Sequence, residues 1–341
     1  MTISSMTSST NALSATQKEC EGIKDLFRAL KVESVVFRVN ATLLCKASAT
    51  FKKMFLRNAD STKPIVLRGL KAQKFSNLLW SLSTSSLPQL LDEKSLERLL
   101  DVEELAQRFA ISQLHIRAES TLLATIAQGK NPAIISCSSR SLSRMVKIVL
   151  RVGNQPLFSF LMQMWTWRLH SRELHHVHAM RLAQPSRWAH DPRPFLKLLG
   201  HAFYAAMMDV EPKLASGQCI NINSTLTQPE TIHIRCGYHS LRSWWDQIAS
   251  QPPLYEHSPR CDHPERCSSA WRVRFESIAD MESLPFPKVD GIRRIQELHK
   301  CLKDDLFLTQ SMPVTCRHNA LQELQKRREN LLETLHHHFD L

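Results

Sequence analysis

The sequence predicts an α+β domain followed by an all-α helical domain. Short β-rich runs alternate with helical patterns near the N-terminus, and beyond Pro132 apolar residues recur at spacings of three and four almost throughout. The chain has 341 residues, 43% of them apolar, which is enough for one or two hydrophobic cores. The predicted layout is a disordered tail at 1–20, the α+β domain at 21–130 and the helical domain at 131–341.

The first domain is predicted to open with a β-hairpin. Residues 26–30 and 35–39 are typical of short strands, and Lys31–Ser34 between them is a turn. A helix with one apolar face follows, because apolar residues recur every four positions at Leu43, Ala47, Phe51 and Phe55. The remaining elements are a brief strand at 64–67 and helices marked by apolar residues at 75–82, 96–109 and 114–126. A small sheet with flanking helices indicates one compact α+β domain.

The second domain is predicted to contain helices only. Their apolar faces lie at 142–149, 156–169, 234–248, 271–278, 292–302 and 321–339. Gly153 ends the first of these helices, Ser268-Ser269 caps the fourth and Asp290 caps the fifth. Proline-rich breaks separate the helical segments, at 185–194, 252–259 and 285–287.

Glycine content and charge exclude several classes of protein. Only eight glycines occur, and no two lie closer than Gly200 and Gly217, so the glycine-rich loops that hold nucleotide phosphates are absent. The net charge of +12 is dispersed, with 18 basic against 12 acidic residues in 1–130 and 26 against 20 in 131–341. This dispersal argues against a nucleic-acid partner, which usually faces a concentrated basic stripe. No apolar run is long enough to span a membrane.

The N-terminal tail and the cysteines indicate an intracellular protein, in the cytoplasm or nucleus. Residues 1–18 are rich in Ser and Thr but lack the basic start and apolar core of a secretory signal and the arginines of a mitochondrial presequence. The nine cysteines are odd in number and scattered, unlike the disulfide framework of a small secreted domain.

The order and spacing of apolar positions in the first domain resemble the BTB/POZ domain. The resemblance spans about residues 24–128 and is carried by VVFRVNATLLCKASATFKKMF, PIVLRGLKAQKFSNLLWSL and LERLLDVEELAQRFAISQLHIRAESTL. Within these segments the family pattern is matched by Leu43, Ser48, Phe51, Met54-Phe55, Ile65 to Leu67, Leu105, Ala106 and Phe109. One position departs from it, because Asn40 replaces a histidine that is frequent in the family.

The second domain resembles the helical half of a group of fungal BTB proteins. The resemblance is carried by RLHSRELHHVHAMRLAQ, FLKLLGHAFYAAMM, CGYHSLRSWWDQI, CDHPERCSSAW and CRHNALQEL. This second resemblance implies a non-enzymatic interaction protein. The BTB/POZ resemblance implies a homodimer formed through the first strand and helix, with Leu43 and Leu44 at the two-fold interface. Some BTB proteins recruit a cullin-type ubiquitin ligase, so the BTB/POZ resemblance also implies a role as a substrate adaptor of such a ligase. Transcriptional regulation is the alternative within the same family.

A group of cysteines and histidines in the second domain predicts a structural zinc site. Cys261, His263 and Cys267 lie within seven residues in a predicted loop, and thiolate and imidazole suit tetrahedral zinc. Cys316 is the preferred fourth ligand, with Cys236, His239 and His318 as other candidates. The simpler interpretation is that these cysteines only pack or lie exposed. A metal-dependent enzyme built on the same residues is the alternative of a different class, although no HExxH motif supports it.

Overall fold

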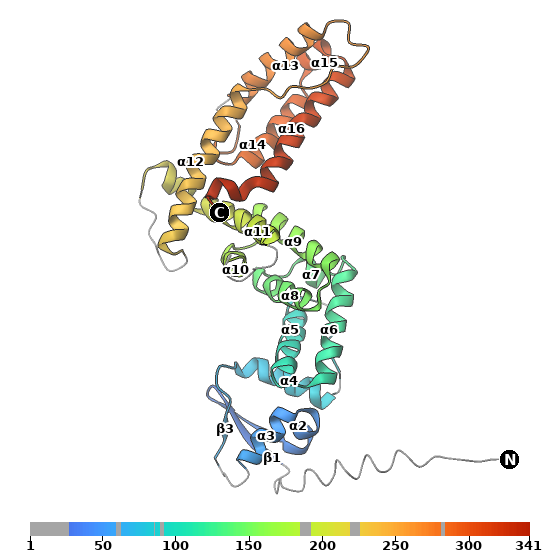
Figure 1. The fold of residues 1–341 in the computed structure, drawn as a ribbon, viewed down its shortest axis with the longest axis vertical. Coiled ribbons are helices and arrows are strands. Elements are labelled where there is room, and N and C mark those ends of the chain that lie inside the picture. Colours follow the sequence, from blue (N-terminus) through green and yellow to red (C-terminus); the bar gives the residue numbers. More distant parts are fainter. Residues whose placement is uncertain are drawn as a thin grey trace, which may run out of the picture. The chain divides into compact units, whose positions relative to one another are not determined.

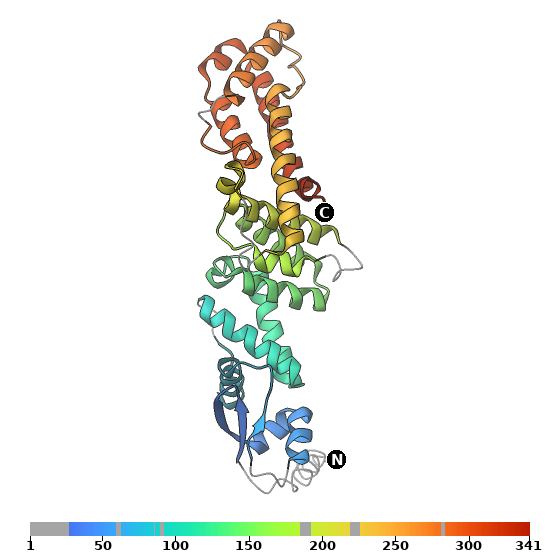
Figure 2. The same ribbon diagram turned by 90° about the vertical axis from the view of Figure 1, so that its left-hand side faces the viewer.

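The computed structural model describes residues 27–58, 63–84, 86–88, 92–184, 192–218, 226–280 and 284–341. The predicted disordered tail at 1–20 lies outside these residues. The chain divides into two compact units, residues 1–161 (unit 1) and residues 162–341 (unit 2), whose elements are labelled in Figure 1 and seen from a second side in Figure 2. Unit 1 holds a small sheet with helices, and the described part of unit 2 is helical, so the predicted fold class is confirmed.

The sheet of unit 1 has three strands in the order β2-β1-β3. Strands β1 (Phe27–Val32) and β2 (Val35–Asn40) form the predicted antiparallel hairpin, and β3 (Ile65–Val66) pairs in parallel with β1. The register places Val32 opposite Val35, so the hairpin turn has two residues. The first of them, Glu33, has a φ of +52° in the left-handed region. Its carboxylate accepts a hydrogen bond from the backbone N–H of Ala72 at 3.0 Å, which helps to hold the turn.

The helix predicted from the four-residue spacing is in fact two helices, α2 (Ala41–Ala47) and α3 (Ala49–Arg57). Ser48 separates them because its backbone is extended and its hydroxyl oxygen accepts from the N–H of Phe51 at 3.2 Å, as an N-cap. The same hydroxyl donates to the carbonyl of Phe109, which lies in a later segment of the chain. A tertiary contact therefore stabilises a break that helical periodicity alone does not reveal.

Phenylalanines fill the core of unit 1. Phe51, Phe55 and Phe75 are fully buried, and the ring of Phe51 stacks on that of Phe109 with centroids 4.6 Å apart. Burial of each ring contributes about 1.5–3 kcal/mol to folding. The three predicted helices that surround this core are confirmed, with bounds α4 Ala72–Thr84, α5 Glu93–Arg108 and α6 Ser112–Ala127.

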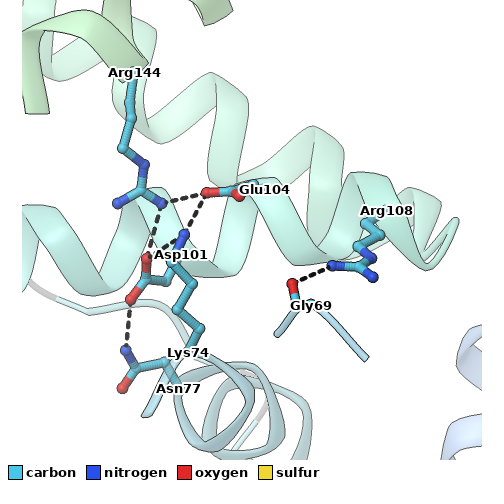
Figure 3. A network of polar contacts seen from close by, with 7 residues as sticks. All are labelled: Gly69, Lys74, Asn77, Asp101, Glu104, Arg108 and Arg144. Atoms are coloured by element: carbon cyan, nitrogen blue, oxygen red, sulfur yellow. Dashed lines mark hydrogen bonds and ion pairs between the residues drawn. The ribbon is translucent and has the colours of Figure 1, made fainter. Parts of the chain in front are cut away.

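Two further helices, α7 (Pro132–Ile135) and α8 (Ser139–Val152), pack on α5. A polar network fixes α8 there, and Figure 3 shows Arg144 reaching from α8 to Asp101 at 2.8 Å and to Glu104 at 2.9 Å. Lys74 of α4 joins the same carboxylate of Glu104 at 2.7 Å. Unit 1 therefore continues past residue 130. The predicted limit at 130 concerns the α+β domain alone and stays a prediction.

The regular secondary structure of unit 2 is helical wherever the structure describes it. Helix α9 (Gln155–His170) contains the division between the units. It is followed by α10 Val177–Leu182, α11 Arg193–Ala215, α12 Gln228–Ser250, α13 Pro264–Ala279, α14 Gly291–Lys303, α15 Leu306–Ser311, α16 Val314–Thr334 and the 3-10 turn η2 Leu335–Phe339. Among the described residues, none of the helices has both the length and the apolar character needed to cross a membrane.

The core of unit 2 between α12 and α16 is built around two buried tryptophans, Trp245 and Trp271. Asp290 caps α14 as predicted, since its carboxylate accepts from the N–H of Arg293 at 3.2 Å. The last predicted helix differs from the structure, because it ends at Thr334 and a 3-10 turn brings Phe339 over Gly237. A Cβ at Gly237 would lie 2.1 Å from the Phe339 ring, so this close packing requires glycine.

Candidate functional site

One candidate site is the outer face of the sheet in unit 1. Along β1, alternate residues are buried, and Arg28, Leu30 and Val32 face the core. Phe27 and Lys31 therefore face outward. The register places Val36 of β2 opposite Lys31 and Val66 of β3 beside it, so both valines share the outward side.

The outward side chains form a partly apolar surface, here called the outer sheet face, made of Phe27, Lys31, Val36, Arg38 and Val66. Its three apolar members are 45%, 53% and 56% exposed in sequence order. The Arg38 guanidinium lies 5.1 Å from the centre of the Phe27 ring, a cation–π contact. Among the described strands β2 is also at the edge of the sheet, and an edge strand can pair with another chain. This surface can bury apolar area against a second protein.

The helix predicted to lie at a two-fold interface presents only one of its two leucines. Leu43 of α2 is 40% exposed, whereas Leu44 is 1% exposed and belongs to the core. Phe51, expected on the same apolar face as Leu43, lies on α3 and is buried. Of Leu43, Leu44 and Phe51, only Leu43 is therefore available to a partner. The break at Ser48 places Phe51 on a second helix, α3, where it faces the core.

The second candidate site is a cluster of three cysteines and a histidine in unit 2, made of His257, Cys261, Cys267 and Cys316, here called the Cys3His cluster. One donor atom from each residue lies within 4.8 Å of the other three. His257 and Cys261 belong to the segment between α12 and α13, and the two other cysteines lie in the first turns of α13 and α16. The sequence prediction named these three cysteines, and the fold brings them together.

The histidine of the cluster differs from the predicted one. His263 is exposed and stands at the N-cap of α13, outside the group, and His257 takes its place. The cause is the start of α13 at Pro264, four residues before the predicted cap at Ser268. Cys267 therefore lies on a helix rather than in a loop. The signal for His257 was present in the sequence, because it precedes Cys261 by four residues in the same proline-rich break.

The three other candidate ligands lie outside the cluster. Cys236 and His239, both on α12, are exposed and are not part of the cluster. His318 is exposed on α16, two residues from Cys316. Since neighbouring residues of a helix point in different directions, Cys316 and His318 cannot share the same site.

Hydrogen bonds orient the donors of the Cys3His cluster. Nδ1 of His257 lies 3.8 Å from Sγ of Cys261, and Nε2 of the same ring lies 2.9 Å from the hydroxyl of Ser268. The backbone N–H of Ser258 donates to Sγ of Cys316 at 3.2 Å. The Tyr255 hydroxyl lies 3.2 Å from Sγ of Cys267. These contacts hold the side chains in place while one donor atom of each lies within 4.8 Å of the other three.

Two thiols of the cluster have a pKa above that of an ordinary cysteine. Burial raises the pKa of Cys267 to about 11, and the adjacent Cys316 thiol contributes to the rise. The pKa of Cys261 is also raised, by desolvation and by its hydrogen bond with Cys316. Three thiols in contact cannot all ionise without a positive charge among them. All three are free cysteines.

A second group of possible metal ligands lies in unit 1 and consists of Glu103, His115 and Glu119. Here Arg151 of α8 occupies the position of a cation, with one nitrogen of its guanidinium bound to Glu103 and to Glu119, the latter at 2.6 Å. The two carboxylates are thus already neutralised by the protein itself. This group stabilises the packing of α8 rather than offering a site.

Comparison with known families agrees with the fold of unit 1. Residues 26–126 match the BTB/POZ domain family. No curated relative matches the chain. The BTB/POZ domain is a protein–protein interaction module, so the N-terminal part of unit 1 is such a module and the remainder of the chain is mostly helical.

Proposed function

We propose that this protein is a non-enzymatic interaction protein that forms a homodimer through the outer sheet face and Leu43, and that docks further proteins through its remaining surface. The observation that carries the proposal is the exposure of Phe27, Val36 and Val66 on one face of the BTB/POZ sheet. Apolar area removed from water contributes about 25 cal/mol per Å², so a symmetric contact that covers these residues twice favours association.

The charges of the outer sheet face determine how such a dimer responds to salt. Lys31 and Arg38 flank the apolar residues, and a two-fold axis brings two copies of each near one another. Repulsion between like charges is screened at high ionic strength. The dimer is therefore expected to tighten as salt is raised, which distinguishes it from an association driven by ion pairs.

Sedimentation equilibrium of the full chain at micromolar concentration tests the dimer. The double variant V36S/V66S removes apolar side chains without adding charge, and at least a tenfold weaker association is expected. The matched control is I116S on α6, because Ile116 is 60% exposed but lies outside the sheet. A monomeric wild-type chain, or equal weakening by the control, would contradict the proposal.

The full chain is the right sample for this experiment, because a fragment ending at residue 130 would disrupt unit 1. Glu103 is buried and pairs with Arg151, which such a fragment lacks. Loss of the cation leaves a buried carboxylate without its partner, at a cost of about 3 kcal/mol. Failure of the fragment to dimerise would then report on folding rather than on the interface.

The finer role that we propose is that of a substrate adaptor for a cullin-type ubiquitin ligase, in which the BTB/POZ domain docks the cullin and unit 2 selects the substrate. The division into a BTB-containing unit and a separate helical unit supports it. Mixing the purified chain with a cullin N-terminal domain tests it by gel filtration. If the protein regulates transcription instead, it should bind or co-precipitate specific DNA sequences, either directly or through a partner.

The metal-dependent enzyme of the alternative hypothesis requires an open coordination position beside a cavity. A cavity of about 1070 Å³ does occur in unit 2, but none of the Cys3His residues lines it. Its walls include Trp245, Asp246, Glu276 and Arg294. The separation of cavity and cluster favours interaction over metal-dependent catalysis.

A further inference from the structure

The geometry points to a structural zinc site in unit 2, in which His257, Cys261, Cys267 and Cys316 bind one Zn²⁺. The inference stands on unit 2 alone and is independent of the proposed dimer. Three sulfur donors and one imidazole form a soft, tetrahedral donor set of the kind that zinc occupies in structural sites. Hard cations such as Mg²⁺ and Ca²⁺ require oxygen ligands, and these four residues offer none.

The distances among the donors are close to those of a tetrahedral zinc site. With Zn–S bonds of about 2.3 Å, tetrahedral ligand atoms lie about 3.7 Å apart. The Nδ1 of His257 is already 3.8 Å from Sγ of Cys261, and no pair in the group exceeds 4.8 Å. The remaining gaps between pairs of donor atoms are at most about 1 Å.

A zinc ligand needs support from the groups around it, and His257 has that support. Its Nε2 lies 2.9 Å from the Ser268 hydroxyl, so Nδ1 is the nitrogen left for the metal. A second hydrogen bond holds the backbone of the segment, since the amide of Asn319 on α16 donates to the carbonyl of Glu256 at 2.8 Å. The ring therefore faces the thiols before any ion binds.

Zinc binding at this site is an exchange of the cation for protons. Three thiol S–H bonds break, three Zn–S bonds and one Zn–N bond form, and three protons pass to solvent, with no change in oxidation state. The thiolates keep hydrogen-bond donors, because the N–H of Ser258 points to Cys316 and the Tyr255 hydroxyl lies beside Cys267. Such donors stabilise the excess negative charge of a site with three thiolates and one Zn²⁺.

The ion would connect three parts of unit 2 directly. Residues 252–258 contain no regular secondary structure, and Leu254 within them is 93% exposed. Within the same segment, Pro253 is buried and Tyr255 packs against the core beside Trp271. One Zn²⁺ would fasten this segment to the first turns of α13 and α16, beside the core around Trp271. Four protein ligands leave no position for a reacting water, so the site is structural.

Metal analysis of the full chain, purified without a metal-affinity tag and without chelator, tests the inference. One zinc per chain is expected in the wild-type protein, and less than a fifth of that in H257A and in C261S. The matched controls are H263A and C301S. His263 is a neighbouring histidine outside the cluster and Cys301 a partly buried cysteine of α14, and both variants should keep their zinc.

A second measurement protects the test against variants that fail to fold. Replacement of zinc by Co²⁺ in the wild-type chain should give the intense visible bands of tetrahedral cobalt together with thiolate charge-transfer absorption. A wild-type chain that contains no zinc and takes up neither Zn²⁺ nor Co²⁺ would overturn the inference. A disulfide between two of the three cysteines, or loss of zinc in H263A equal to that in H257A, would also overturn it.

Discussion

The two groups of possible metal ligands differ in where their positive charge comes from. In unit 1 the carboxylates of Glu103 and Glu119 are bridged by Arg151, a cation that the chain itself supplies. In the Cys3His cluster of unit 2 the N–H of Ser258 and the hydroxyl of Tyr255, both neutral groups, contact the thiols, and the pKa of the Cys267 thiol is raised. Proximity of ligand atoms is therefore insufficient evidence for a metal site. The balance of charge distinguishes a packing contact from a site that requires an ion.

The largest effect that we expect is that a chelator destabilises unit 2 and leaves unit 1 unchanged. Removal of zinc should lower the stability of unit 2 by about 4 kcal/mol relative to protein in zinc at about a thousand times its Kd, because the ion binds only the folded state. Hydrogen exchange should show faster exchange in 252–263 and in the first turns of α13 and α16. Amides of α5 serve as the internal control, and an equal loss of protection there would show general unfolding instead.

The next effect comes from removing the cation of unit 1. The R151A variant leaves Glu103 buried beside Glu119 without its guanidinium partner, so unit 1 should lose about 3 kcal/mol in denaturant unfolding. Millimolar Zn²⁺ should restore part of this loss, since two carboxylates and His115 then face an open position. The control is K326A, which breaks an exposed pair with Glu323 and should cost under about 0.5 kcal/mol. If Zn²⁺ stabilised the wild-type protein as much as it stabilises R151A, the comparison between the two groups would be contradicted.

The affinity of the Cys3His cluster for zinc should fall as pH falls. The pKa of the Cys267 thiol is raised to about 11 without metal, so at neutral pH zinc must displace its proton. Protons compete more strongly at lower pH, and with three displaced per ion the affinity should drop by up to about a thousandfold from pH 7.5 to 6.5. Competition with a chelator of known affinity measures it. An affinity independent of pH would exclude thiolate ligands.

The smallest effect concerns the histidines of the two groups. H115Q should cost about 0.5–1 kcal/mol, because Nδ1 of His115 lies 3.4 Å from a Glu103 carboxylate that Arg151 already neutralises. The metal content of this variant should equal that of the wild type. His257 is the matched counterpart, since its loss is expected to remove the zinc. Equal metal loss in both variants would show that the group in unit 1 also binds an ion.

Some of the fold follows directly from local patterns. The hairpin at β1 and β2 and the helices α4, α5 and α6 were predictable because strand alternation and helical spacing are repeated within each short segment. As the sequence indicates, Asp290 begins α14 with a side-chain cap and Gly153 ends α8 in the left-handed conformation. In each of these cases the interaction joins residues that are close in the chain.

Other features depend on contacts that spacing does not encode. The break at Ser48 is stabilised by Phe109, and the position of α8 by the pairing of Arg144 and Arg151 with carboxylates of α5. The early start of α13 exchanges His263 for His257 in the Cys3His cluster. An error of a few residues in a helix boundary thus changed the identity of one candidate ligand.

The sequence by itself determined the α+β and helical parts, the resemblance of the first part to the BTB/POZ domain, and the three cysteines as candidate ligands. The tertiary structure decided which histidine joins them, which leucine of α2 stays exposed and which carboxylates already have a cation. The physical reason is the distance along the chain over which each kind of interaction acts. Propensities, caps and periodicity act within a few residues, whereas burial and charge balance depend on groups that meet only when the chain folds.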